Sequence, residues 1–348
     1  MFPWLGELLE PVFGPFRLLS SHLFLIVAGT SVSFALTFIL LPRSFGLLPK
    51  DRGREHAVHS DISVGKPTGG GFVFVLVAVF TAALTAPLYW RHFVLLGLVV
   101  VAMVSGYVDD RSKRPWGEYL KGTMDFAIAL AAAFILFPDG GHIWIPFTTV
   151  EFDLSAFVFV PLATIVIWLS INSTNCTDGV DGLSSTLVLL ALISLAVFLY
   201  VVVGNSEISE YLLLPFYGHA ASWAIMSFSM VGSLAAYLWF NAYPSKVLMG
   251  DAGSRALGFF IGVTIIVSGN PFLILITSSV MLVNGGTGIL KVALIRFARI
   301  KVFKRVRFPL HDHFRHTKGW SNAQVLVRFA LVQILIIIVM FGIFVKVR

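Results

Sequence analysis

The chain has 348 residues, of which 57% are hydrophobic and only 12% are charged, and its mean hydropathy is +0.88. Soluble globular proteins carry about a quarter of charged residues, so this composition excludes a soluble domain and predicts an all-α polytopic membrane protein. The net charge of +7 is spread over several loops. Basic residues spread in this way indicate how the chain is oriented in the membrane and attract anionic membrane lipids. Since they form no single basic patch, we expect no nucleic-acid partner.

Apolar runs near 20 residues long recur along the chain, which is the length that a helix needs to cross a bilayer core about 30 Å thick. We interpret ten of them as transmembrane helices, at residues 22–42, 70–89, 93–108, 123–137, 156–171, 182–203, 213–239, 255–269, 271–297 and 324–345. Without a visible linker or internal repeat, residues 1–348 are predicted to form a single integral-membrane domain.

Two segments differ from a plain membrane span. Residues 1–21 combine aromatic residues with prolines and glycines and are typical of an interfacial lead-in. The run 271–297 contains Asn284, Lys291 and Arg296, so we expect its last turns to leave the hydrocarbon.

Lysine and arginine are concentrated in alternate connections, which predicts the orientation of the chain. Connections 43–69, 109–122 and 298–323 are rich in basic residues, whereas 138–155 and 204–212 contain neither lysine nor arginine. We therefore expect the three basic connections in the cytoplasm and both termini outside.

Four polar segments follow the third, fifth, seventh and ninth runs, all on the predicted cytoplasmic side. They are Asp109-Asp110, residues 172–183, residues 249–254 and His311-Asp312-His313. Because they share one side of a helical bundle, we expect them to form a single site. An isolated Asp-Asp at a helix end is ordinarily a solvated pair, but carboxylates at membrane depth repel one another unless a cation or a basic group lies between them. Asp109 and Asp110 are therefore candidates for a functional site.

Residues 172–183 carry the densest polar pattern. Asn172, Asn175 and Asp178 recur every three residues, so on a helix they form one polar stripe below an apolar run. A turn or cap would explain Asp178 with its following glycine, but not two amides together with two carboxylates. We predict that these side chains and Asp181 bind substrate.

The other polar segments suggest phosphate and metal chemistry. Asp251 could be an N-cap of the following helix, but beside the other carboxylates it is predicted to ligate Mg²⁺, which prefers one or two carboxylates plus water. His311 and His313 lie in the most basic loop and suit binding of diphosphate oxygens; a zinc site is the less favoured alternative. Lys66 and Thr68 precede three glycines, which form either a flexible helix entry or an anion site.

As a set, these motifs resemble the polyprenyl-phosphate N-acetylhexosamine-1-phosphate transferase superfamily, and within it most closely the bacterial phospho-N-acetylmuramoyl-pentapeptide transferase family. The resemblance runs from about Lys50 to the C-terminus. Its motifs are DDxxK at 109–113, NxxNxTDGxDGL at 172–183, WFNAxPxxVxMGDxGSxALG at 239–258, and PLHxHF with GWSxxQVxxRF at 309–329.

The resemblance implies ten helices with both ends outside, a bacterial cytoplasmic membrane with the site facing the cytoplasm, Mg²⁺ as cofactor and often a homodimer. It assigns Asp109 and Asp110 to the catalytic pair and Asp251 to the Mg²⁺ ligand. Carried over by position, it gives nucleotide binding or catalysis to Asp178, Asp181 and Asn241, and it matches His311 and His313 to the histidines of the last cytoplasmic loop.

The resemblance also predicts the reaction: transfer of phospho-N-acetylmuramoyl-pentapeptide from its UDP donor to undecaprenyl phosphate, with release of UMP. Lys113 and Lys121 are expected to hold phosphate oxygens, and His311 to steady the diphosphate. The sequence departs from the family at Asp312, Leu248 and the glycine loop. These departures leave open the same chemistry with UDP-N-acetylglucosamine. An ion-coupled transporter is the less favoured class, since transporters place carboxylates near the midplane of the membrane.

Overall fold

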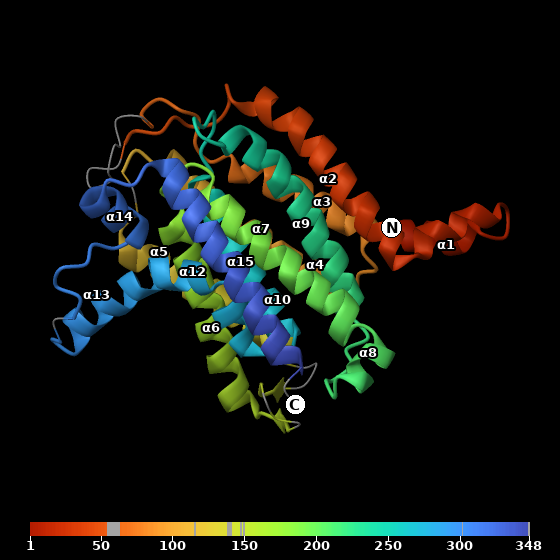
Figure 1. Cartoon of the computed structure of the whole chain (residues 1–348). Helices are drawn as coiled ribbons and strands as arrows, with labels where there is room; N and C mark the ends of the chain where they lie inside the picture. Colours follow the sequence, from red (N-terminus) through yellow and green to blue (C-terminus); the bar gives the residue numbers. More distant parts are fainter. Residues whose placement is uncertain are drawn as a thin grey trace.

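The computed structural model describes residues 1–53, 63–114, 116–137, 141–146, 148, 150–300 and 302–346. Parts of the three basic connections, residues 54–62, 115 and 301, therefore lie outside the described residues. The chain is almost entirely helical (Figure 1). Its elements are α1 (Phe2–Leu9), η1 (Gly14–Ser20), α2 (His22–Ser44), α3 (Gly71–Thr85), α4 (Trp90–Arg111), α5 (Glu118–Leu136), β1 (His142–Trp144), β2 (Glu151–Asp153), α6 (Ala156–Thr177), α7 (Leu183–Val197), η4 (Phe198–Val203), α8 (Ser206–Tyr211), α9 (Ala220–Asn241), α10 (Gly250–Val267), η5 (Pro271–Leu273), α11 (Ile274–Thr277), α12 (Ser279–Met281), η6 (Leu282–Gly286), α13 (Thr287–Phe297), α14 (Leu310–Lys318) and α15 (Asn322–Lys346).

The predicted all-α polytopic membrane protein is confirmed. Within the described residues, nine helices are long and apolar enough to cross a membrane, and the second predicted run forms a shorter apolar helix, α3, of 15 residues. Each of the ten predicted runs overlaps one of these helices, although their ends differ by several residues. In the seventh run, α9 begins only at Ala220, because residues 212–219, with Pro215 and Gly218, form turns and a loop. In the ninth run, the helix that is long enough to cross a membrane begins only at Ser279.

Helix α10 forms the centre of the bundle. In the most apolar 18 residues of each helix, 94% of the residues of α10 are buried inside the protein, but only 11% of those of α15. It packs against α3, α4, α6 and α7. A Cβ placed on Gly106 of α4 would collide with the backbone at Asp251 and Ala252, so α4 approaches the start of α10 at backbone contact. This close packing fixes the end of α4 against the beginning of α10.

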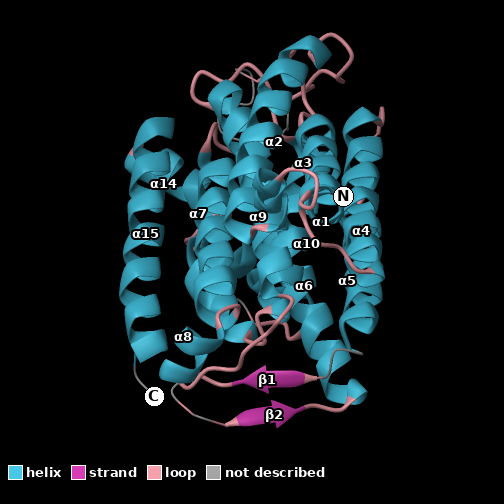
Figure 2. Cartoon of the chain, turned by 90° about the vertical axis from the view of Figure 1, so that its right-hand side faces the viewer, coloured by secondary structure: helices cyan, strands magenta, loops and turns pink. Residues whose placement is uncertain are grey.

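The two ends of the bundle are chemically different. Strands β1 and β2 pair antiparallel and lie at the same end as the C-terminal end of α15 (Figure 2). The backbone N–H of Trp144 in β1 donates to the carbonyl of Gly269, just after α10, over 3.0 Å. Since α4 and α6 end, and α10 begins, at the opposite end, three of the four polar segments lie there.

The ninth run is a broken helix. It passes through α11, α12 and the π-type turn η6 before continuing as α13. Gln333 of α15, which is fully buried, serves the backbone at the first break: its Oε1 accepts from the N–H of Val280 at 2.9 Å and the hydroxyl of Ser279 at 3.1 Å, and its Nε2 donates to the carbonyl of Ile276 at 2.8 Å. A membrane-embedded break requires such partners, because lipid supplies none.

The end of the ninth run lies outside the core of the bundle. None of the residues of α13 is buried, and this helix projects from the bundle in Figure 1. Asn284 lies in η6 with only 1% of its surface exposed, and its amide is hydrogen-bonded to Thr177 and to the backbone N–H of His311. The exit of the last turns from the hydrocarbon stays a prediction.

The N-terminal lead-in comprises α1 and η1, and α1 points away from the side of the bundle in Figure 1. Many of its apolar side chains are exposed, including Trp4 and Phe13. An interfacial position for residues 1–21 and a single domain for the whole chain stay predictions.

Candidate active site

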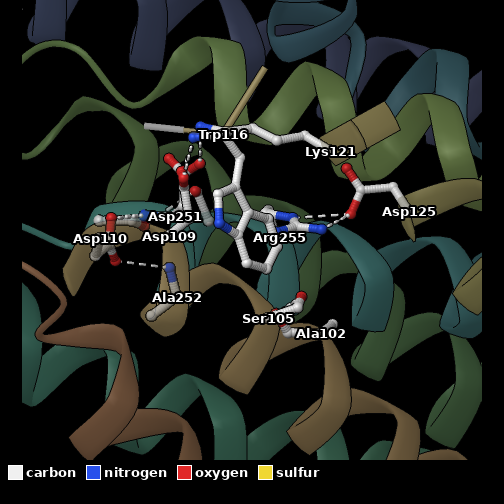
Figure 3. Close-up of polar contacts among 12 residues, drawn as sticks. Ala102, Ser105, Asp109, Asp110, Trp116, Lys121, Asp125, Asp251, Ala252 and Arg255 are labelled. Atoms are coloured by element: carbon white, nitrogen blue, oxygen red, sulfur yellow. Dashed lines mark hydrogen bonds and ion pairs between the residues drawn. The ribbon is translucent and has the colours of Figure 1, made fainter. Parts of the chain in front are cut away.

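A lysine lies between two carboxylates from different helices (Figure 3). The Nζ of Lys121 in α5 is 2.5 Å from Oδ2 of Asp109 in α4 and 2.8 Å from Oδ2 of Asp251 in α10. Asp109 is 6% exposed and Asp251 5% exposed. The backbone N–H of Trp116 donates to the other oxygen of Asp109 at 2.6 Å. The ammonium group therefore offsets the repulsion between two nearly buried carboxylates.

Asp110 has a different environment from its neighbour Asp109. Its Oδ1 accepts from the backbone N–H of Asp251 at 2.9 Å, and its Oδ2 accepts from that of Ala252 at 3.1 Å. These are first-turn amides of α10, which lack partners within their own helix and carry the positive end of the helix dipole. Asp110 therefore caps α10 from outside and fixes the position of Asp251 (Figure 3).

The glycine loop packs against the segment that precedes α10. The N–H groups of Gly70 and Gly71 donate to the carbonyls of Leu248 and Met249, both at 3.0 Å, and Thr68, nearly buried, donates its N–H to Pro49 at 2.8 Å. These three backbone donors therefore have acceptors within the protein. The two interpretations of this loop, a flexible helix entry or an anion site, stay predictions.

Lys66 connects this loop to the second polar segment. Its Nζ donates to the hydroxyl of Ser245 at 3.0 Å and is 4.0 Å from Oδ2 of Asp181. Ser245 in turn donates its hydroxyl and its N–H to the carboxylate of Asp181, at 2.9 and 3.1 Å. Lys66 and Asp181 thus belong to one polar cluster at the same end of the bundle.

The polar stripe of the fifth run lies at the end of α6, as predicted. Asn172 donates from Nδ2 to the carbonyl of Trp168 at 2.9 Å, while Asn175 and the C-cap Asp178 are partly exposed. Asn241 is buried instead, and its Oδ1 accepts from the N–H of Gly182 at 3.0 Å and its Nδ2 donates to Val247 at 2.9 Å. Asn241 therefore holds two site segments together.

His311 reaches the second segment from α14. Its side chain is nearly buried, with 2% of the residue exposed. The backbone N–H of His311 donates to Oδ1 of Asn284 at 2.9 Å, and Nδ1 of its imidazole lies 3.1 Å from Nδ2 of the same amide. Asn284 also donates to Thr177 at 3.1 Å. A Cβ on Gly179 would come within 2.7 Å of Nε2 of His311, so only a glycine allows this approach.

The remaining predicted residues lie at the edge of this region. Asp312 is bound by Arg315 at 3.2 Å and its Oδ1 is 3.8 Å from Nε2 of His311. His313 is partly buried, and its Nδ1 is 3.3 Å from the hydroxyl of Thr317. Lys113, beyond the end of α4, is exposed.

The two carboxylates beside Lys121 are the candidates for binding a divalent cation. Asp109 and Asp251 present oxygens to one positive charge, that of Lys121. Among the described residues, no three or more of His, Cys, Asp and Glu are grouped so that they could hold a metal ion. Mg²⁺ is commonly held by one or two carboxylates plus water and substrate phosphates, whereas a structural zinc site needs four protein ligands.

Comparison with known proteins shows the family of this chain. Residues 92–269, which contain three of the four polar segments, match the family described as glycosyl transferase family 4. The phospho-N-acetylmuramoyl-pentapeptide-transferase of Treponema pallidum is 48% identical over 344 residues, covering 98% of this chain and 95% of the relative. The proteins of the same name from Helicobacter pylori and Helicobacter hepaticus are 33% and 30% identical, and each covers about nine-tenths of both chains.

The chain belongs to the phospho-N-acetylmuramoyl-pentapeptide transferase family. This membership confirms the resemblance drawn from the motifs. The alignment with the Treponema protein covers nearly the whole length of both chains, so membership does not depend on one conserved-looking stretch.

Several residues of the site carried no clear signal in the sequence. Trp116 acts through its backbone N–H, and Ser245 is an ordinary residue of a loop. Polar groups within membrane spans are costly and need partners, so they are a signal that a sequence can give. Asn284 stood out in this way as an amide in an apolar run, and the same signal marks Asp125 of α5 and Arg255 of α10.

Proposed function

We propose that this protein transfers phospho-N-acetylmuramoyl-pentapeptide from its UDP donor to undecaprenyl phosphate, giving the first lipid intermediate of peptidoglycan synthesis and UMP. The observation that carries the proposal is Lys121 between Asp109 and Asp251 where three helices meet, in a chain of this family. Such a cluster suits phosphoryl transfer, in which the protein mainly positions the reactants and neutralises charge.

Asp109 and Asp110 have different surroundings, and we assign them different roles. Both oxygens of Asp110 accept from backbone amides of α10, so Asp110 acts on the position of Asp251. Asp109 is then the residue that orients the acceptor phosphate or takes its proton. An oxygen of that phosphate forms a bond to the sugar-linked phosphorus of the donor, while the bond from this phosphorus to the bridging oxygen of UMP breaks.

The basic residues would neutralise the charge of two anionic substrates. Lys121, which already faces Asp109 and Asp251, would hold phosphate oxygens beside them. Lys113 is exposed beyond the end of α4 and would attract the donor diphosphate, and the buried His311 would steady it. Asn175, Asp178 and the outer histidine His313 are the candidates for donor recognition.

Asp251 would hold Mg²⁺. When bound, the ion supplies positive charge to the donor diphosphate and offsets the repulsion between the substrates. The same proposal places the protein in the bacterial cytoplasmic membrane, in contact with membrane lipids, with this end of the bundle in the cytoplasm, where a UDP-linked donor is soluble. We expect a homodimer from the family, and the molecular mass of the purified protein in detergent would distinguish a dimer from a monomer.

The proposal is tested by UMP release from purified protein in detergent with undecaprenyl phosphate and Mg²⁺. UDP-N-acetylmuramoyl-pentapeptide is compared with UDP-N-acetylglucosamine as donor, and chelated samples serve as blanks. We expect release only with the pentapeptide donor and only with Mg²⁺. Release from the N-acetylglucosamine donor alone would replace the proposed donor, and release from neither donor would refute the reaction.

A further inference from the structure

A second pair of opposite charges joins α5 to α10 inside the bundle. The Nε and Nη2 of Arg255 lie 2.8 and 2.6 Å from Oδ1 of Asp125 (Figure 3). Arg255 is fully buried and Asp125 is 1% exposed. Both residues lie within helices that are apolar enough to cross a membrane. The pair is therefore shielded from water, unlike the loop residues of the site.

Stability does not explain this pair well. Removing two charges from water costs several kcal/mol per ion, and replacing a buried pair with apolar residues is often neutral or stabilising by roughly 1–4 kcal/mol. The pair is also incompletely satisfied, since Nη1 of Arg255 has no hydrogen-bond partner among the described residues. Its presence in the bundle calls for another role.

The pair has a regular relation to the site. Lys121 and Asp125 are four residues apart on α5, and Asp251 and Arg255 are four residues apart on α10, so each charge of the pair lies one turn from a site residue. Four residues correspond to a rise of about 6 Å along a helix axis. The contacts Lys121–Asp251 and Asp125–Arg255 thus form two successive cross-links between the same two helices.

We propose that Asp125 and Arg255 are positioning residues: their pairing fixes α5 against α10 so that the Nζ of Lys121 and the carboxylate of Asp251 stay in contact. An arginine fork on one carboxylate oxygen restricts both sliding and rotation of the two helices more than apolar contacts do. The inference rests on the proposed function for its kinetic consequence, but its geometric part does not depend on the identity of the donor.

The decisive variant replaces both charges at once, Asp125→Leu with Arg255→Met. Because no unpaired charge is left, we expect this variant to fold with a thermal midpoint equal to or above that of the wild type. We expect its kcat to fall roughly ten- to 100-fold, since a displacement of about 1 Å at a catalytic group can cost that much. KM for the donor should change little, and the affinity for Mg²⁺ measured without substrate should fall.

Two comparisons complete the test. Phe259→Leu, one turn further along α10 in an equally buried position, disturbs packing without removing charge and should keep kcat within about twofold. Arg255→Lys in the presence of Asp125 keeps the charge and should retain more turnover than the double variant. A merely structural pair would lower thermal stability and leave kcat and Mg²⁺ affinity of the folded fraction unchanged.

The outcomes separate this inference from the proposed function. Wild-type kcat and Mg²⁺ affinity in a stable double variant would overturn the positioning role even though the enzyme is active. If the wild type itself releases no UMP, the proposed reaction fails, and the Mg²⁺ affinities of wild type and double variant still decide whether the pair positions Asp251.

Discussion

Lys121 determines what the two carboxylates beside it can do. Its Nζ contacts Asp109 and Asp251, which come from different helices and are both nearly buried. Without a cation between them, the two negative charges would repel. The lysine therefore allows the two carboxylates to lie close together in the interior of the bundle.

Asp251→Asn is expected to abolish turnover while leaving the protein extractable and folded. The amide keeps the size of the side chain but removes the charge that would bind Mg²⁺, and Lys121 still has Asp109 as a partner. UMP release and the thermal midpoint measure the two effects. Asp153→Asn in the exposed strand β2 is the matched control and should behave as wild type; normal turnover of Asp251→Asn would disprove the metal assignment.

Gly179→Ala tests the approach of His311 to the end of α6. The new methyl group would lie within 2.7 Å of Nε2 of the imidazole, which is held from behind by Asn284 and cannot withdraw freely. We expect a clear loss of kcat with the bundle still folded, measured by UMP release and thermal denaturation. Gly122→Ala, where a Cβ meets open space, is the control; equal activity of the two variants would show that His311 is not needed at this position.

At the scale of elements, the site depends on α4 and α10 meeting at backbone contact. Asp109 and Asp110 end α4, and Asp251 begins α10, so their distances follow from how closely the two helices pack. Two glycines, Gly106 in α4 and Gly71 in α3, face the first turn of α10 from different sides. Small residues thus set the geometry of the charged ones.

Gly106→Ala is expected to push α4 away from the start of α10. A Cβ there collides with backbone atoms, which cannot rotate aside, and overpacking of this kind costs about 1–3 kcal/mol. We expect a lower thermal midpoint together with a loss of turnover. Gly97→Ala, in open space on the same helix, should change neither. Unchanged activity in Gly106→Ala would mean that α4 and α10 can separate without loss of function.

Much of this architecture could be predicted from the sequence because a bilayer imposes the length and polarity of each crossing. All ten runs correspond to helices. Asp109 and Asp110 follow the third run and Asp251 follows the seventh, and because both runs are odd-numbered, they end on the same side of the bundle. The pairing of Lys121 with the carboxylates of two helices could not be predicted, because it depends on which helices are neighbours. The capping of α10 by Asp110 was hidden for the same reason.

The orientation of the whole molecule can be tested with single cysteines. In a Cys176→Ser background, Glu151→Cys places a thiol at the exposed hairpin and Arg114→Cys places one near the candidate site. We expect an impermeant maleimide added to intact cells to label position 151, and position 114 only after permeabilisation. The reverse pattern would place the carboxylate cluster outside and contradict a reaction that uses a cytoplasmic donor.

Gln333 shows how the broken ninth crossing limits sequence change elsewhere. Most side chains of α15 are exposed on the outside of the bundle, where one aliphatic residue can replace another at little cost. At Gln333 an equally large and more hydrophobic leucine would leave a backbone N–H and a carbonyl of the neighbouring segment without partners in a dry environment. In the apolar part of this helix, residues 329–345, the position least tolerant of a more hydrophobic side chain is therefore the one polar residue that the sequence places there.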